Sequence, residues 1–289
     1  MKTIFRHTER ISDREFRKGK MMRDQIIQHP LSEETIKYDD YIAGLAKGLN
    51  ILEAFGTDRQ RLNVTQVAER TNITRTAARR YLKTLKFLGY LETDEYYYWL
   101  THKVLKFSGA FLSTAHLPKI SQSVLNHLSE KTTLVFSVVV QDNYEVVPIA
   151  RSVPQNDHFR VSPFGIHLGN RIPAHASSTG KVLLAHKSLE EQKNWIKLYG
   201  LKRFTAYTYT EEASFLATLQ TIKDNGYCIS AEEYELGVTA IAIPIINQTG
   251  DIIAGLNAVA PISKVNDTYL INTVLPLLRE AAKEIRDMI

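Results

Sequence analysis

The sequence predicts an α+β protein with an N-terminal winged helix-turn-helix domain and a C-terminal domain built on an antiparallel sheet. Two short helical patterns separated by a tight break occupy residues 64–90, and a hairpin pattern follows them. From residue 133 onward, β-rich runs and helical stretches are mixed, without the regular alternation of a doubly wound sheet. A chain of 289 residues is long enough for one small and one ordinary domain.

The composition is that of an ordinary protein, 44% hydrophobic and 23% charged, with a net charge of +5. Residues 41–116 hold 11 Lys and Arg against 6 Asp and Glu, so this stretch alone has a net charge of +5. The excess positive charge therefore lies in the stretch that contains the helix-turn-helix, as expected for a domain that binds DNA phosphates. Cys228 is the single cysteine, which excludes a disulfide within the chain and suits a reducing cytoplasm. No apolar run reaches 18 residues, so no membrane segment is expected.

Residues 1–40 carry charges without a sustained apolar face, which indicates a mobile N-terminal arm. Residues 41–55 then show an apolar stripe at helical spacing, which predicts the first helix of the winged domain. The stripe consists of Ile42, Leu45, Leu49, Leu52 and Phe55. We place the DNA-binding domain at residues 41–100.

Residues 65–90 contain the DNA-binding pattern. Thr65 is the expected N-cap of a first short helix, and Thr74 is the expected N-cap of a second. The second helix has apolar residues on one face and Lys and Arg on another, and residues 71–91 contain no acidic residue. A cationic second helix is typical of a recognition helix in the DNA major groove. The candidate DNA-binding residues are Thr65, Thr74, Arg75, Thr76, Arg79, Arg80, Lys83 and Lys86.

An amphipathic surface helix whose charges are merely solvated is the alternative for this stretch. Against it, Gly89 ends the helix, and a polar turn at residues 92–95 precedes the aromatic run of residues 96–100. This order predicts a hairpin, and a hairpin after the second helix is a wing. Residues 101–116 then have apolar residues at helical spacing, which predicts a linker helix buried in a dimer contact or against its own domain.

Pro118 marks the expected entry to the second domain, residues 117–289. Its periodicities predict helices at 120–128, 177–186, 190–199, 211–225 and 267–288. Strands are expected at 133–141, 145–151, 227–230, 238–247 and 251–260, with a polar loop at 152–173.

The order of these parts resembles the IclR family of transcriptional regulators. Four pieces carry the resemblance: the helix-turn-helix, GLAKGLNILEAF at 44–55, IPAHASSTGKVLLA at 172–185 and EEYELGVTAIAIPI at 232–245. It covers residues 41–289 and is most similar to the branch that regulates aromatic-acid catabolism. The resemblance implies a cytoplasmic homodimer or tetramer without enzymatic activity, metal or cofactor. It also implies a double-stranded DNA operator and a GAF-like effector domain that binds p-hydroxybenzoate or protocatechuate.

In the family the effector pocket lies on the sheet, beneath the short helix of the H-A-x-x-x-G-K motif. Carried over by position, the pocket residues are Ser178, Thr179, Ser230, Ala240, Asn257 and Val259. Ser230 stands where small-acid binders of the family often have an acidic residue, which implies a less polar pocket suited to a ring. The helix N-terminus at 177–180 is the expected carboxylate site, with Arg171 and Arg160 as further candidates.

An enzyme is the other class of function. Ser178 and Lys181 match the S-x-x-K pattern of Ser-Lys hydrolases, but neither S-D-N nor K-T-G occurs in the chain. The histidines lack metal-ligand spacing, so His175 is expected to pack in the core. Arg171 also fits a structural salt bridge. Glu232 and Glu233 are expected in a solvated turn. Cys228 is expected to be a buried packing residue in an apolar run.

Overall fold

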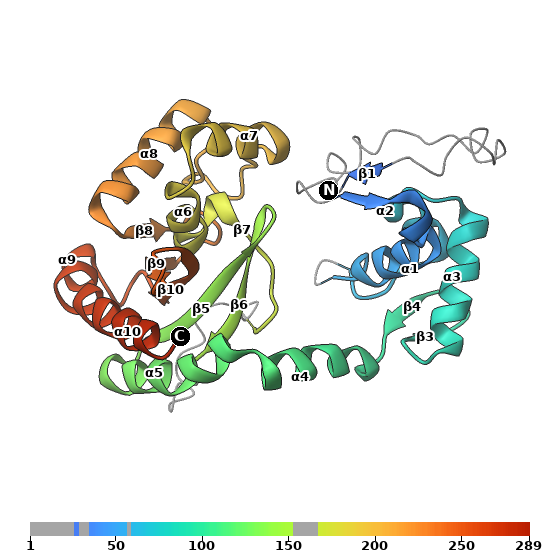
Figure 1. Ribbon diagram of the computed structural model, residues 1–289, viewed down its shortest axis with the longest axis horizontal. Coiled ribbons are helices and arrows are strands. Elements are labelled where there is room, and N and C mark those ends of the chain that lie inside the picture. The colour runs from blue at the N-terminus through green and yellow to red at the C-terminus, as the bar shows by residue number, and fades with distance from the viewer. Residues whose placement is uncertain (1–25, 29–34, 57–58, 153–166) are drawn as a thin grey trace. The chain divides into compact units, whose positions relative to one another are not determined.

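The computed structural model describes residues 26–28, 35–56, 59–152 and 167–289 (Figure 1). The chain divides into two compact units, Met1–Gly109 and Ala110–Ile289. In the part of the first unit that precedes the winged domain, β1 (Ile26–Gln28) and β2 (Thr35–Lys37) pair antiparallel and lead into the 3₁₀ turn η3 (Tyr38–Asp40). This hairpin lies where a mobile arm was expected, and the other residues of that arm lie outside the described part of the chain.

The first unit is a winged helix-turn-helix, as predicted. Its helices are α1 (Ala43–Glu53), α2 (Val64–Thr71) and α3 (Arg75–Phe87), and its wing strands are β3 (Leu91–Thr93) and β4 (Tyr98–Leu100). Ile51, Val67 and Leu82 bring the three helices together in a common buried core. Leu62 pairs with Tyr98 through two backbone hydrogen bonds and so joins the wing to the helices.

The helix caps differ from the sequence prediction at one position. Asn63, not Thr65, is the N-cap of α2: its side chain accepts a hydrogen bond from the Gln66 backbone N–H, and the Gln66 side chain accepts one from the Asn63 N–H. This reciprocal capping box satisfies two donors at once, which a threonine cap at residue 65 would not do. Thr74 caps α3 as predicted, accepting from the Ala77 N–H at 3.2 Å.

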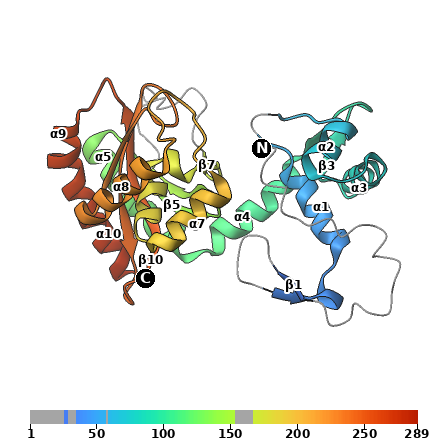
Figure 2. The ribbon, with the colours of Figure 1, turned by 90° about the horizontal axis from the view of Figure 1, so that it is seen from above.

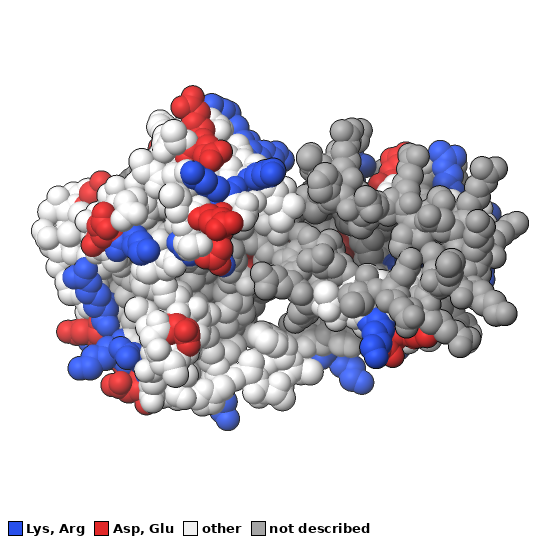
Figure 3. All heavy atoms as spheres, turned by 45° about the horizontal axis from the view of Figure 1, so that its top comes forward, with Lys and Arg blue, Asp and Glu red and all other residues white. Residues whose placement is uncertain are grey.

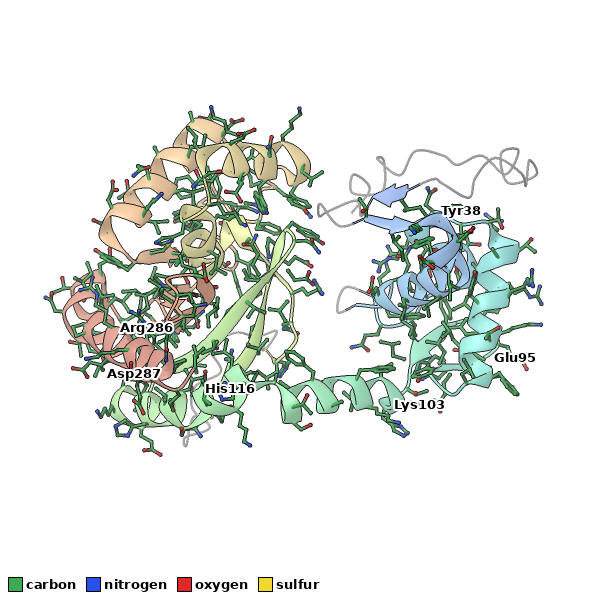
Figure 4. All side chains as sticks on the ribbon, viewed as in Figure 1. Tyr38, Glu95, Lys103, His116, Arg286 and Asp287 are labelled. Atoms are coloured by element: carbon green, nitrogen blue, oxygen red, sulfur yellow. The ribbon has the colours of Figure 1, made fainter. Side chains whose placement is uncertain are left out.

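A 3₁₀ turn, η4 (His102–Val104), leads into α4 (Leu105–Thr114), and α5 (His116–Thr132) follows. Pro118 lies in the first turn of α5, not before it, because a proline there forfeits no helical hydrogen bond. Lys103, labelled in Figure 4, donates from Nζ to the Leu88 carbonyl oxygen at 2.6 Å and lies over the Tyr90 ring. These contacts fix the start of the linker region on its own unit.

The second unit is built on a six-stranded antiparallel sheet with the order β7-β6-β5-β10-β9-β8. The strands are β5 (Val135–Asp142), β6 (Glu145–Arg151), β7 (Ile172–Pro173), β8 (Cys228–Ala231), β9 (Val238–Ile246) and β10 (Ile252–Pro261). Five of them were predicted. The short edge strand β7 was not, because Ile172 and Pro173 alone carry no strand periodicity and pair only through contacts with Val146 and Glu145.

Helices cover both faces of this sheet (Figures 1 and 2). One face packs against α5 and α10 (Leu275–Asp287), and the other against α6 (Ser178–Ala185), which α8 (Glu212–Asn225) covers in turn. The remaining helical elements are η5 (Ala174–Ala176), α7 (Leu189–Tyr199), α9 (Asp267–Tyr269) and the π-helical turn η6 (Leu270–Val274). The C-terminal helix is therefore interrupted by a wide turn that the sequence did not predict. No helix in the described part of the chain could span a bilayer.

Candidate functional site

The exposed face of α3 is cationic. Ala78, Leu82 and Leu85 are buried on the opposite face and hold the helix on its unit. The exposed side chains are Arg75, Thr76, Arg79, Arg80, Lys83 and Lys86, with Thr74 at the cap. Within the described residues these cations form no ion pair, so their charge is available to phosphates. Thr65 is half-buried on α2.

The wing is stiffened by its turn. Asp94 accepts hydrogen bonds from the Tyr96 and Tyr97 backbone N–H groups, and the Tyr97 bond is the main cause of the lowered pKa of Asp94. Glu95, labelled in Figure 4, stands at the turn with φ of 80°. The Arg61 guanidinium lies 4.3 Å from the centre of the Trp99 ring and adds a cation–π contact across the base of the wing.

Reversing one charge on α3 is expected to weaken DNA binding. For Arg79→Glu we expect an affinity loss of roughly 1–3 kcal/mol, because a contact to a base or phosphate is replaced by repulsion; a lost phosphate contact would also flatten the salt dependence by about one unit. Lys193→Glu makes the same charge change at an exposed position of α7 and should leave affinity nearly unchanged. Titration of labelled duplex DNA at several salt concentrations measures both quantities; equal behaviour of the two variants would contradict the assignment of α3 as the recognition helix.

The second unit contains a cavity of about 630 Å³, including its open mouth, on the α6 side of the sheet. All six pocket residues carried over from the family line it: Ser178, Thr179, Ser230, Ala240, Asn257 and Val259. Arg171 is not among the lining residues.

Strand register explains why residues far apart in sequence meet in this cavity. Directly opposed residues of antiparallel strands point to the same face of a sheet. Arg151 on β6 opposes Ser137 on β5, which opposes Asn257 on β10. Val259 opposes Ala240 on β9, and Ala240 opposes Ser230 on β8. These two rows form the floor of the cavity.

The N-terminus of α6 forms the cavity wall. Ser177 caps the helix by accepting from the Gly180 N–H at 3.1 Å, and Ser178 and Thr179 are buried beside it. Gly180 presses directly on the preceding 3₁₀ turn: a Cβ atom there would lie 2.2 Å from the carbonyl oxygen of Ala174. Only glycine allows this approach.

Three polar atoms that line or adjoin the cavity are buried and have no hydrogen-bond partner among the described residues: Arg151 Nη1, Glu233 Oε2 and Asn257 Oδ1. Burial lowers the pKa of Arg151, which is the electrostatic signature of a desolvated cation. Buried polar groups in native proteins are almost always satisfied. Their convergence on one cavity indicates a polar ligand.

Glu233 was expected in a solvated turn. The structure corrects this, because the residue is buried and only 6% exposed. Its Oε1 pairs with Nζ of Lys181, which is 1% exposed, and accepts from Ser230 Oγ at 2.9 Å. Burial alone would lower the pKa of Lys181, but the adjacent Cys228 and Glu233 raise it. A protonated, paired lysine cannot serve as the base for Ser178, which removes the basis of the hydrolase alternative.

Other predicted residues have structural roles. Arg171 is half-exposed and forms ion pairs with Asp142 and, at 3.2 Å, Glu145. His175 is buried, as predicted; its Nε2–H donates to the Lys202 carbonyl oxygen at 2.9 Å, and burial lowers its pKa. Cys228 is buried, as predicted, and burial raises the pKa of its thiol to about 11.

Arg160, the other arginine considered as a carboxylate partner, lies outside the described residues. No group of three or more His, Cys, Asp or Glu side chains that could hold a metal occurs in residues 26–28, 35–56, 59–152 and 167–289. On the face of the second unit shown in Figure 3, basic and acidic side chains are interspersed. That face therefore has no continuous basic patch that could bind DNA as the cationic face of α3 could.

Sequence reasoning missed Arg151, Ser137, Glu233 and Tyr234 as cavity residues. For Arg151 a signal was present, since a charged residue follows directly on the apolar run VVPIA. For Glu233 the decisive partner is Lys181, 52 residues away, and no local pattern reveals that contact.

Comparison with known proteins matches both units to characterised families. Residues 109–287 match the family model described as "Bacterial transcriptional regulator IclR C-terminal", and residues 44–95 match the IclR helix-turn-helix domain.

Two curated relatives come from Acinetobacter baylyi. The chain is 62% identical over 92% of its length to the p-hydroxybenzoate hydroxylase transcriptional activator, covering 98% of that protein. It is 49% identical over 93% of its length to the Pca operon regulatory protein, covering 97% of it. Among solved structures, it resembles a double mutant of the PobR inducer-binding domain from Acinetobacter in complex with 3-hydroxybenzoic acid. That similarity has a TM-score of 0.58 and 54% identity, over 61% of this chain and all of the other.

Proposed function

The chain belongs to the IclR family of bacterial transcriptional regulators, and within that family we propose that it activates genes of aromatic-acid catabolism when a hydroxylated benzoate binds its second unit. It is a DNA-binding regulator and, like its relatives, not an enzyme. The observation that carries the effector proposal is the cavity lined by Arg151, whose buried Nη1 has no hydrogen-bond partner among the described residues, in a chain 62% identical to the p-hydroxybenzoate hydroxylase activator. We place the protein in the cytoplasm, where its DNA operator is.

The effector we favour is p-hydroxybenzoate. A benzoate ring is flat and apolar on its faces, and Val259 and Ala240 offer an apolar floor for it. Its carboxylate must exchange water for equally good donors. Protocatechuate, with one more ring hydroxyl, is the alternative.

Arg151 is the proposed carboxylate partner, in preference to the N-terminus of α6. The Gly180 N–H of that helix is already bonded to Ser177, so fewer free donors remain there than the sequence suggested. A guanidinium supplies full charge and can bind a carboxylate through two parallel hydrogen bonds. Ser178 and Thr179 then contribute hydroxyl groups to the wall beside the ring.

Thermal unfolding with a panel of acids tests this function. At 100 times its Kd a ligand stabilises the folded state by about 2.7 kcal/mol. For a unit of this size that corresponds to a rise in Tm of roughly 5–10 °C. We expect this rise with p-hydroxybenzoate but not with the uncharged p-hydroxybenzamide; no rise with any aromatic acid would contradict the proposal.

We further propose that the protein is a homodimer or a tetramer assembled through apolar helix surfaces. Leu105, Phe107 and Phe111 on α4 are 64%, 60% and 51% exposed, and Ile42 and Leu45, the N-cap and a first-turn residue of α1, are 66% and 59% exposed. Exposed apolar residues in this number are typical of a surface that another subunit covers. Through α4, effector binding would change the placement of two winged domains, since allostery requires two sites and two states.

Introducing a charge on α4 is expected to disrupt this assembly. Phe111→Glu should give monomers or aggregates, because a carboxylate would be buried without a partner. Phe107→Glu should do the same, with the added loss of its ring contact to Tyr90 at 5.9 Å. Sedimentation velocity measures the outcome, with Lys131→Glu on the exposed side of α5 as control. An intact dimer of both phenylalanine variants would contradict the assignment.

A further inference from the structure

Only one of the two carboxylate oxygens of Glu233 has hydrogen-bond partners in the described part of the chain. Oε1 has two partners, the Lys181 ammonium and the Ser230 hydroxyl, whereas Oε2 is buried and has none among the described residues. Glu233 is 6% exposed and is one of the residues that line the cavity, so its unsatisfied oxygen is buried at the cavity's border. A buried, unpaired carboxylate oxygen is unfavourable unless something donates to it.

The position of this oxygen relative to Arg151 follows from the sheet. Arg151 lies on β6, whereas Ser230, to which Glu233 is bonded, lies on β8 at the far edge. Four inter-strand spacings of about 4.8 Å separate β6 from β8, or about 19 Å between Cα atoms. Among the described residues, the cavity therefore has a cation on one side and an acceptor oxygen without a partner on the other. A ligand that satisfies both is elongated, with an anion at one end and a hydrogen-bond donor at the other.

We propose that Glu233 is a specificity-determining residue whose free Oε2 accepts a hydrogen bond from the effector hydroxyl para to the carboxylate. This inference rests on the proposed function, in which the carboxylate binds Arg151. A benzene ring with para substituents holds its two polar groups at opposite ends, as the cavity requires. Benzoate itself leaves Oε2 without a donor.

The loop that carries Glu233 is fixed before any ligand arrives. Thr208 Oγ1 donates to the Glu233 carbonyl oxygen at 2.6 Å, and Thr205 Oγ1 donates to that of Glu232 at 2.7 Å. Glu232 has φ of 58° and accepts from the Gly237 N–H at 2.8 Å, which closes the turn. With Oε1 held by Lys181, the carboxylate is preorganised, so its orientation costs little when a ligand binds.

A series of para-substituted benzoates tests the inference on the unmodified full-length protein. Donors at the para position, as in p-hydroxybenzoate and p-aminobenzoate, should bind roughly 10- to 100-fold more tightly than benzoate or p-fluorobenzoate, the range expected for a hydrogen bond to a charged group. m-Hydroxybenzoate should fall nearer to benzoate. Calorimetric titration gives each Kd.

A double variant separates specificity from binding. Lys181→Met with Glu233→Leu removes both charges and keeps side-chain volume, an exchange that buried ion pairs often tolerate. Benzoate should still bind, while the preference for p-hydroxybenzoate over benzoate should fall to within about threefold. Glu284→Gln, at an exposed site on α10, is the control and should keep the wild-type ratio.

The outcomes are distinguishable from failure of the proposed function. Two results would show that Glu233 does not bind the para hydroxyl: equal affinity of the wild-type protein for benzoate and p-hydroxybenzoate, or a wild-type preference kept by the double variant. Either result leaves the proposal of a benzoate effector intact. If no benzoate binds, the proposed function itself fails. If the double variant does not fold, the wild-type ligand series alone decides.

Discussion

Replacing Arg151 by methionine is expected to weaken effector binding by roughly 2–5 kcal/mol, the loss measured when one partner of a buried charge pair is removed. In Arg151, Nη1 is buried without a hydrogen-bond partner among the described residues, and burial lowers the pKa of the guanidinium, so part of the desolvation penalty is already present without a ligand. Methionine removes that penalty, so the unliganded Tm of Arg151→Met should stay the same or rise. The expected signature is therefore lost binding in a protein that is no less stable.

Arg171→Met is the matched control. It deletes an arginine whose own side chain is 52% exposed, so its ion pairs with Asp142 and Glu145 are screened by solvent on the arginine side and contribute little to stability. Calorimetry with p-hydroxybenzoate should give a near-normal Kd for Arg171→Met. If instead Arg171→Met loses the ligand and Arg151→Met retains it, the carboxylate partner has been assigned to the wrong arginine.

Replacing Gly180 by alanine is expected to destabilise the second unit by roughly 3 kcal/mol, at the upper end for overpacking, because the added methyl group would meet backbone atoms. The Cβ would lie 2.2 Å from the Ala174 carbonyl oxygen and 2.3 Å from its Cα, so no side-chain rotation relieves the clash. At 2–4 °C per kcal/mol for a unit of this size, Tm should fall by roughly 6–12 °C.

Gly109→Ala provides the contrast within the same chain. Gly109 lies inside α4, and a Cβ there would meet nothing within 4 Å. Because alanine is the better helix former, this variant should be neutral or more stable by up to about 1 kcal/mol. Thermal unfolding followed by circular dichroism compares the two; a Tm for Gly180→Ala equal to that of the wild type would show that α6 can move away from η5.

The winged helix-turn-helix could be predicted from sequence because its signals are local. Thr74 caps α3 through a residue three positions away, and the apolar spacing of Ala78, Leu82 and Leu85 fixes the buried face. The cap of α2 was misassigned for an equally local reason. Asn63 and Thr65 both offer a side-chain oxygen, and only the reciprocal bond from Gln66 decides between them.

The cavity was only partly predictable because its polar ends depend on long-range pairing. Its floor followed from the family motifs, whereas Arg151 reaches it through strand register across β6, β5 and β10. Glu233 looked like a turn residue because its ion-pair partner Lys181 comes from α6, 52 positions earlier. Arg171 was a candidate because its planar guanidinium can bind a carboxylate, but its side chain forms the alternative, a structural salt bridge to the β5–β6 hairpin.

A crystal structure of the chain with p-hydroxybenzoate tests the central claim most directly. The account predicts the ring over Asn257, Val259 and Ala240, with its carboxylate within hydrogen-bond distance of the Arg151 guanidinium. A carboxylate bound to the first-turn N–H groups of α6 with Arg151 left unpaired, or a ligand outside this cavity, would contradict it.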